Sequence, residues 1–578
     1  MLGLSLIDWG VLALYIAGIT VVGLRATRAM RSSGDYFMGG RRFGRVLMIA
    51  QAFGTGTRTD QAVAVMGAAA QVGLAGIWYQ WLYLFSTPFF WLIAPLYRRM
   101  RYITIGDFFE KRFGTKMGAA YAFVGLLYFT LESGIILRAA GVTIEAITGG
   151  AVPSTVAVLA VMAFFVAYGL LGGLVAAATT QFVQGLFILV LSFLLIPFAI
   201  DAAGGIEGIR QAVSPERFSL VAGTEVTGFF IVMSILNAFV GIVVIPHHMA
   251  INGSGKDEIA CRTGWTYGTF LKRLATLGWA FTGIFLAVLF PALSTATGGE
   301  REQALGMAVR ELLPAGLVGL MVAAMIAGCV AAANAYMVNG SALFTRNFYL
   351  RYYKPHASER ETLWSARLSG LAVVVLGVVF ALVIPSVIEG LVLIWKITAF
   401  LGIAFWVAIA WRRANRYGAV ASVAVAATLS FVTDAMGWSF PAQIALYLPA
   451  GFLTMILVSR FTRPEPEDRL NEFYSLLNTP VGEEERLEKA GITTIHEAEQ
   501  GDPAATLPPE HERPPIPLLD DAPAAARGES LMLANLLRLH RGFSVARYRV
   551  DLKGFGIGWV LVFGFLALAM VLARLVST

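Results

Sequence analysis

Long apolar segments recur along the whole chain, and they constrain its fold more than any other feature of the sequence. A helix needs about 20 apolar residues to cross the hydrocarbon core of a bilayer. Charged residues make up 14% of the 578 residues, against about 25% in an average soluble domain. The sequence therefore predicts an all-α polytopic membrane protein with about 14 transmembrane helices. The predicted segments are approximately 4–25, 44–72, 74–97, 117–147, 153–171, 174–200, 226–248, 264–291, 312–345, 365–385, 387–411, 416–436, 441–460 and 555–576.

Basic residues are concentrated in every second loop between these segments. Arg41 and Arg42 follow the first segment, Arg98 and Arg99 follow the third, and the intervening loops carry few lysines or arginines. Loops rich in Lys and Arg stay in the cytoplasm. We therefore expect a protein of the plasma (inner) membrane with both termini outside the cytoplasm. The alternation also places residues 461–553 in the cytoplasm.

Residues 461–553 differ from the rest of the chain because they are charged and rich in proline. Such a composition predicts a segment that is partly helical and partly disordered, and we interpret it as a tether or a regulatory linker. It contains no Gly-rich phosphate loop, metal-ligand cluster or kinase-like motif. His247 and His248 are adjacent at a predicted cytoplasmic helix end, which suits a gate or a cap better than a chelate. The sequence therefore predicts neither an enzyme nor a metal site.

The segment 44–72 is interrupted at its centre. Two apolar flanks of about nine residues, each too short to cross a bilayer, enclose "GTGTRTDQ", Gly54 to Gln61. Unwound backbone at membrane depth is tolerated where it is buried in protein or lines a watery cavity, and transporters use such breaks to bind ions and solutes. A glycine kink kept for packing is the alternative. The run of Thr, Arg, Thr, Asp and Gln favours a binding site.

Other polar residues fall at membrane depth, namely Glu132, Arg138, Asn237 and Lys396. Ionisable groups in a bilayer cost several kcal/mol and usually serve a function. Each residue alone is equally compatible with one half of a structural ion pair. Together with the interrupted helix they favour a central polar cavity.

Several motifs make the chain resemble the sodium:solute symporter family. They include "AQAFGTGTRTDQAVAVMGAAAQVGLA", "YITIGDFFEKRFG", "YGLLGGLVAAATTQFVQG", "MVAAMIAGCVAAANAYMVNGSALFTRNFY" and "WRRANRYGAVAS", within residues 5–460. The resemblance implies the LeuT-like 5+5 inverted-repeat fold of the bacterial leucine transporter. The implied division is an N-terminal helix and basic loop (1–43), a first repeat (44–202), a second repeat (203–414), two peripheral helices (415–460), the insert (461–553) and a last helix (554–578).

The resemblance also places an ion site. In sodium-coupled members, backbone carbonyls of the first and eighth core helices hold Na⁺, at positions that correspond here to Gly54, Thr57 and Gly328. Two serine hydroxyls complete that site, and their positions are occupied by Ala331 and Ala332. These last three positions share one helix face, because they are spaced i, i+3 and i+4. The face is retained, and its hydroxyls are lost.

Two further substitutions alter this implied ion site. The supporting aspartate of the family corresponds to Gln181, and Arg58 stands where the family usually has a small residue. An arginine stays charged at any relevant pH and has five donors. We therefore expect Arg58 to hold the unwound carbonyls in place of Na⁺, with Asp60 and Glu132 as possible proton carriers. Alternatively, Arg58 pairs with Asp60 or Glu132, and Na⁺ binds through other ligands. No cofactor is expected.

The resemblance to sugar-transporting members implies a solute site as well. Its positions correspond to Gln61, Gln80, Asn237 and Lys272, and Lys396 adds a further cation. These side chains suit a small polar solute with hydroxyl groups or a carboxylate. The predicted function is secondary active transport by alternating access, with an ordinary Na⁺-coupled symporter or a transporter-like sensor as alternatives. Nucleic acid is not an expected partner.

Overall fold

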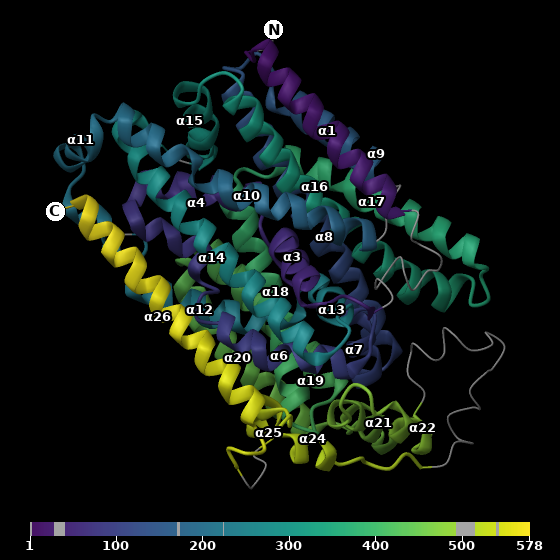
Figure 1. The fold of residues 1–578 in the computed structure, drawn as a ribbon. Coiled ribbons are helices and arrows are strands. Elements are labelled where there is room, and N and C mark those ends of the chain that lie inside the picture. Colours follow the sequence, from purple (N-terminus) through teal and green to yellow (C-terminus); the bar gives the residue numbers. More distant parts are fainter. Residues whose placement is uncertain are drawn as a thin grey trace.

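The computed structural model of the protein describes residues 3–27, 41–169, 174–223, 225–296, 298–492, 515–538 and 543–577. All of the regular elements in these ranges are helices. The longer ones pack into one bundle (Figure 1). Within these described ranges, ten helices are long and apolar enough to cross a membrane, or eleven if one bent pair counts as a single span. All fourteen predicted segments coincide with a helix or with consecutive helices in the described part of the chain.

The apolar segments form the following helices. They are α1 (Leu6–Thr27), α3 (Arg45–Gly56), α4 (Thr59–Val72), α5 (Trp78–Trp81), α6 (Thr87–Met100), α8 (Thr115–Ile147), α9 (Ser154–Gly169), α10 (Leu174–Ala202), α12 (Gly228–Gly241), α13 (His247–Gly253), α14 (Glu258–Leu289), α16 (Leu317–Phe344), α17 (Glu359–Val383), α18 (Val387–Ala410), α19 (Arg416–Ala435), α20 (Phe440–Phe461) and α26 (Arg549–Ser577). Shorter connecting helices include α7 (Ile105–Phe113), α11 (Gly205–Ala212) and α15 (Ala304–Leu312). A π-helical turn, η7 (Thr345–Tyr353), extends α16.

Burial distinguishes the central helices from the peripheral ones. The apolar window of the span Leu317–Tyr353 is 82% buried, whereas that of α26 is 17% buried. A helix that is apolar all round lies either in a protein core or against lipid. α16 therefore belongs to the centre of the bundle, and α26 exposes its apolar surface at the edge, where Figure 1 shows it.

Two helices are broken inside the bundle. The first break separates α3 from α4 at Thr57 and Arg58, both of which have extended backbone angles. It is narrower than the predicted interruption from Gly54 to Gln61, because the glycines remain in the last turn of α3. The second break falls at Ile245 and Pro246 and bends the chain by 64°. A proline disfavours the helical conformation of the residue before it, which accounts for this second break.

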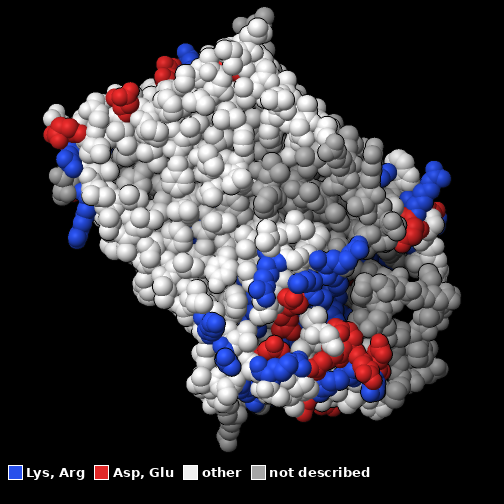
Figure 2. Space-filling model, in the orientation of Figure 1, with Lys and Arg blue, Asp and Glu red and all other residues white. Residues whose placement is uncertain are grey.

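The insert is packed beneath the bundle rather than suspended from it. Its described part contains α21 (Glu467–Asn478), α22 (Glu484–Lys489), α24 (Ala522–Arg527) and α25 (Met532–Leu537). Figure 1 shows these helices at one end of the molecule and both chain termini toward the other. The space-filling view shows charged side chains gathered at the insert end, while the surface above is largely uncharged (Figure 2). The described residues 465–492 and 515–538 contain the helices that a partly helical insert predicts, and they pack against the transmembrane helices.

Candidate functional site

Arg58 lies at the break between α3 and α4 and binds two buried carboxylates. Its Nε donates to Oδ1 of Asp60 at 2.9 Å, and its Nη2 donates to Oδ2 at 2.8 Å. The same Nη2 lies 2.8 Å from Oε2 of Glu132, which comes from α8. Arg58 is 6% exposed and Asp60 is fully buried. The guanidinium thus forms a bidentate pair with one carboxylate and an ion pair with a second.

Two tyrosines complete this charged cluster. Nη1 of Arg58 donates to the hydroxyl of Tyr336 on α16, and the hydroxyl of Tyr128 donates to Oε1 of Glu132 at 2.9 Å. Buried charges are tolerated when they are paired and their remaining polar atoms are hydrogen-bonded. Arg58 therefore ties together three parts of the bundle, which are the helix break, α8 and α16.

The first turn of α4 also contacts α16 through a residue other than Arg58. The hydroxyl of Thr59 donates to the carbonyl of Met325 at 2.9 Å, and it lies 3.3 Å from the sulfur of Cys329. A methyl group on Gly328 would come within 3.4 Å of the same hydroxyl. This is an ordinary van der Waals distance, so position 328 lies at the contact between α4 and α16 without requiring glycine. The eighth core helix of the predicted ion site is adjacent to the first.

The predicted ion-site residues are distributed along this contact. Gly54 and Thr57 are buried near the end of α3, and Gly328 and Ala332 are buried on α16. Tyr336, which Arg58 contacts, lies one helical turn beyond Ala332. The side chains of Gln181 and Ala331 lie outside the described part of the structure.

The guanidinium of Arg58 does not hold the unwound carbonyls as the sequence led us to expect. All of its nitrogens have side-chain partners, which are the two carboxylates and the hydroxyl of Tyr336. The alternative prediction, pairing with Asp60 or Glu132, describes the observed geometry, with both carboxylates engaged. Carboxylates outcompete carbonyls here because charge-assisted bonds are about twice as strong as neutral ones.

A mainly apolar cavity of about 440 Å³ lies on one side of Arg58, next to Gly328. Its polar side chains are Arg58, Thr59, Ser192 and Trp279. The indole of Trp279 donates to the hydroxyl of Ser192 at 3.0 Å, and Thr59 donates to Met325. Sodium needs several oxygen ligands, and the side-chain hydroxyls here already have partners among the described residues. The remaining lining residues are Ala62, Met66, Ile188, Leu191, Leu305, Met321, Ala324, Met325 and Gly328.

A second, polar cavity of about 710 Å³ lies on the other side of Arg58, so this residue separates the two spaces. It is enclosed by side chains from α3, α4, α8, α13, α14 and α18, together with residues of the α5–α6 region. Aromatic walls with a few convergent polar groups are typical of pockets for small ligands. The residues that surround it are Ala52, Gly56, Arg58, Gln61, Gln80, Tyr83, Phe90, Tyr128, Glu132, Ile242, Ile245, His247, His248, Ile251, Trp265, Thr269, Lys272, Arg273, Leu391, Ile394 and Trp395.

Several polar groups in the polar cavity have no partner within the described protein. Oε1 of Gln61, Oε1 of Gln80 and Nδ1 of His247 are buried without a hydrogen bond. Lys272 is 8% exposed, and its stem approaches Gly56 at the helix break. Buried polar groups are normally satisfied, so a cluster of unsatisfied ones in a cavity indicates where a ligand binds. Three of the five predicted solute-binding residues, Gln61, Gln80 and Lys272, are therefore brought together.

The structure places the other two predicted solute-binding residues elsewhere. Asn237 donates to the carbonyl of Trp395 at 3.1 Å and accepts from the hydroxyl of Tyr447 at 2.5 Å, so it joins α12 to α18 and α20. Lys396 is paired with Asp434 of α19 at 2.9 Å. Neither lines the polar cavity. Both take part in contacts between helices. This is the structural role that the sequence left open for single polar residues at membrane depth.

His247 and His248 lie at a helix end, as the sequence predicts, and both line the polar cavity. They begin α13 directly after the second break, and Nδ1 of His248 lies 2.8 Å from the carbonyl of Ile242. The ring of His247 packs 5.6 Å from the ring of Tyr336. Pro246 is the sequence signal that could have predicted this position, because a proline inside an apolar segment marks a helix break at membrane depth.

Among the described residues, no group of three or more His, Cys, Asp or Glu side chains is arranged to hold a metal ion. The cavity is bounded by the guanidiniums of Arg58 and Arg273, one carboxylate, one lysine and two histidines, and Nη1 of Arg273 donates to the carbonyl of Gln80 at 2.6 Å. Such an arrangement can bind a small solute through ionic and hydrogen bonds.

Comparisons with known proteins agree with this geometry. Residues 36–426 match the model of the sodium:solute symporter family. The chain is 23% identical over 474 residues to a sodium/glucose cotransporter of Vibrio parahaemolyticus, covering 76% of this chain and 87% of that protein. It is 26% identical over 448 residues to the sodium/proline symporter of Escherichia coli K12, covering 73% and 87%.

Solved structures show the fold. A Na⁺-coupled sialic acid symporter in a substrate-bound outward-open state superimposes with a TM-score of 0.68 at 18% identity, covering 80% of this chain and 99% of that one. The inward-facing structure of Mhp1 superimposes with a TM-score of 0.51 at 15% identity, covering 75% and 95%. These proteins are LeuT-fold transporters, so the predicted LeuT-like fold class is confirmed.

Proposed function

Because the chain belongs to the sodium:solute symporter family, and is therefore a secondary active transporter rather than an enzyme, we propose that it moves a small polar solute by alternating access through the polar cavity. The observation that carries this proposal is the group of unsatisfied polar atoms around one cavity at two helix breaks. Discontinuous helices at the bilayer midplane are where transporters of this architecture bind solutes. Gln61, Gln80, His247 and Lys272 would contact the solute.

We further propose that Arg58 serves as a built-in cation at the place where relatives bind Na⁺. It bridges the break of the first core helix to α16 and to α8, as a bound ion would, and it is covalently part of the chain. The hydroxyls in the neighbouring apolar cavity are already engaged. The solute would then bind without Na⁺, and transport would be uniport, exchange or proton-coupled.

The charges around the polar cavity indicate the kind of solute. The positive charge of Arg58 is offset by Asp60 and Glu132, whereas Lys272 has no carboxylate partner among the described residues. An ammonium group in a largely buried cavity gains most from a ligand that brings negative charge or several acceptor atoms. We therefore expect a solute with a carboxylate or with clustered hydroxyl groups. The names of the sugar, proline and myo-inositol transporters among the relatives describe such solutes.

Uptake into proteoliposomes tests the proposed function. Purified protein would be reconstituted, and radiolabelled proline, glucose, myo-inositol and lactate would be supplied outside. We expect at least one of them to enter faster than into protein-free liposomes, with a rate that saturates as its concentration rises. Binding of a solute to the protein without any uptake would favour the sensor alternative.

Once a transported solute is identified, Gln61→Ala tests the site itself. We expect the Kd for that solute to rise about fivefold, because a lost buried hydrogen bond costs about 1 kcal/mol. Gln443→Ala is the matched control, since Gln443 is buried on α20 and donates to Asp434 at 2.9 Å, away from the cavity. Isothermal titration calorimetry measures both variants. Equal affinities in Gln61→Ala and the wild type would remove Gln61 from the site.

A further inference from the structure

The two described pieces of the insert lie across the ends of several transmembrane helices. We call residues 465–492 and 515–538 the clasp. Figure 1 shows its helices beneath α6, α7 and α19, and Figure 2 shows acidic and basic side chains interleaved over this end of the molecule. The clasp has two faces that differ in chemistry, and its helix α21 packs against both α6 and α7.

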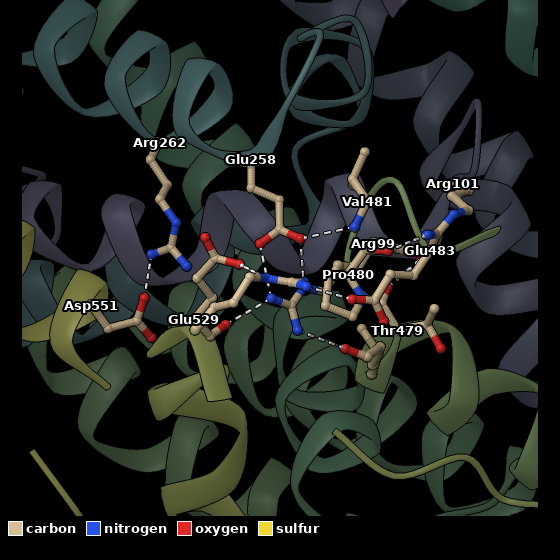
Figure 3. Close-up of polar contacts among 12 residues, drawn as sticks. Arg99, Arg101, Glu258, Arg262, Thr479, Pro480, Val481, Glu483, Glu529 and Asp551 are labelled. Carbon is tan, nitrogen blue, oxygen red and sulfur yellow. Dashed lines mark hydrogen bonds and ion pairs between the residues drawn. The ribbon is translucent and has the colours of Figure 1, made fainter. Parts of the chain in front are cut away.

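The first face is charged and contacts the ends of α6 and α14. Arg99, fully buried at the end of α6, pairs with Glu258 at the start of α14 at 2.8 Å and donates to the carbonyl of Glu529 at 2.7 Å. The backbone nitrogen of Val481 donates to Glu258 at 3.2 Å. Figure 3 shows this network, in which segments of the clasp approach the two helix ends. The clasp thus contacts the ends of α6 and α14 where these two helices meet.

Arg101 extends the charged face. Its Nη2 donates to the carbonyl of Pro480 at 2.8 Å and to Oε1 of Glu484 at 2.9 Å, and its Nη1 donates to the carbonyl of Thr479 at 3.2 Å. Arg101 itself has a φ of 58°. A residue other than glycine adopts this left-handed conformation only where its surroundings enforce it. The end of α6 is therefore shaped to present this side chain to the clasp.

The second face is aromatic and contacts α18 and α7. The hydroxyl of Tyr474 donates to the carbonyl of Ala408 in the last turn of α18 at 2.7 Å, and Nε of Arg538 donates to the carbonyl of Ile409 at 3.2 Å. The guanidinium of Arg538 lies 4.6 Å from the centre of the Tyr474 ring. The ring of Phe473 packs 5.5 Å from that of Phe108 on α7. Phe473 and Tyr474 are almost completely buried.

One element thus holds the end of α18 with one face and the ends of α6 and α14 with the other. Alternating access needs relative movement of the helix groups that surround the solute. We propose that the clasp is a conformational latch, which keeps the cavity closed at this end and releases its charged face when the cavity opens there. The proposal rests on the proposed transport function.

The chemistry of the two faces determines which one releases. The side chain of Glu484 is 36% exposed and that of Arg101 is 4% exposed, and on release both charges would regain hydration, which offsets much of the lost pairing. Separating the buried aromatic face would expose large apolar surface, which is costly. Burial alone would raise the pKa of Glu484, but the guanidinium of Arg101 holds that pKa below its usual value. The pair therefore stays ionised at neutral pH, and release does not require a proton.

A reporter cysteine measures this opening without any solute. Ala52 lies on α3 and lines the polar cavity. The start of α3 lies beside Gly255. The carbonyl of Gly255 accepts a hydrogen bond from Arg98, at the end of the molecule that carries the clasp. Cys261 and Cys329 are buried and would be replaced by serine in a background that carries Ala52→Cys. The rate of labelling by a charged thiol reagent would be followed in nanodiscs.

Glu484→Lys repels Arg101 and should favour the released state. We expect labelling of Ala52→Cys to become about fivefold faster, the change that a surface ion pair of typical strength can bring about. Glu472→Lys is the matched control, because Glu472 pairs with Lys111 of α7 at 2.6 Å, on the face that stays attached in both states. It should leave the rate within twofold. The swap Arg101→Glu with Glu484→Lys should restore the original rate.

Two outcomes would overturn the latch. Equal labelling rates in Glu484→Lys and the parent would show that the charged face does not restrain opening. Equal acceleration by Glu472→Lys and Glu484→Lys would show general loosening rather than release of one face. Because labelling reports opening and not transport, a failure here is distinct from a failure of the uptake experiment.

Discussion

Replacing Arg58 with alanine should destabilise the protein more than any other single substitution in the transmembrane region. The change leaves the carboxylates of Asp60 and Glu132 buried without a counter-ion and close to each other. Removing one partner of a buried ion pair costs about 3–5 kcal/mol. We expect a large fall in the apparent Tm in detergent and a shortened half-life of the folded protein, both measured by size-exclusion chromatography after heating.

Two further variants separate the charge effect from a simple loss of packing. Arg58→Met combined with Asp60→Asn and Glu132→Gln removes all three charges, and it should recover most of the lost stability, because replacing a whole buried ion cluster is often neutral. Arg58→Lys should be intermediate, since one ammonium group cannot reproduce the bidentate pair and also reach Tyr336. If Arg58→Ala were as stable as the wild type, the cluster would contribute nothing to the fold.

The transmembrane segments could be predicted from the sequence because length and hydropathy are local properties. The break at Arg58 could also be predicted from the sequence, because a polar run interrupts an apolar segment. Its width was overestimated because Gly54 and Gly56 stay helical in the last turn of α3 despite the low helix propensity of glycine. The break at Pro246 was missed although a proline marked it, because it falls two residues before the end of the predicted segment 226–248.

The partners of the charged residues could be predicted only in part. Asp60 lies two residues from Arg58, and Glu132 was one of few carboxylates at membrane depth, so their pairing was foreseen as an alternative. Tyr336 is separated from Arg58 by 278 residues and belongs to an apolar stretch, which gives no sign of the contact. The contacts of the insert were missed for the same reason, because they join residues that are far apart in the sequence. Its charged and proline-rich composition resembles a linker, and only the fold brings Arg99 and Arg101 to it.

Sodium should have no specific effect on the stability of this protein. If Arg58 fills the role of the ion, replacing Na⁺ by K⁺ or choline at constant ionic strength should leave the apparent Tm within about 1 °C, and binding or uptake of a solute should not depend on Na⁺. An ion that binds only the folded state, at 100 times its Kd, would instead stabilise it by about 2.7 kcal/mol. Relatives whose names describe sodium coupling, purified alongside, provide the positive control.

A sodium site should return when its ligands are restored together. Arg58→Ser with Ala331→Ser, Ala332→Ser and Gln181→Asp removes the fixed cation and supplies oxygen atoms at the positions that the family uses. It also leaves Asp60 and Glu132 without their guanidinium, so a bound Na⁺ would compensate their charge. We expect this variant to be unstable in choline and to gain several degrees of apparent Tm in Na⁺. A steep, saturable effect of Na⁺ on the wild type would show instead that Arg58 is only a structural ion-pair partner and that an ordinary sodium site lies elsewhere in the bundle.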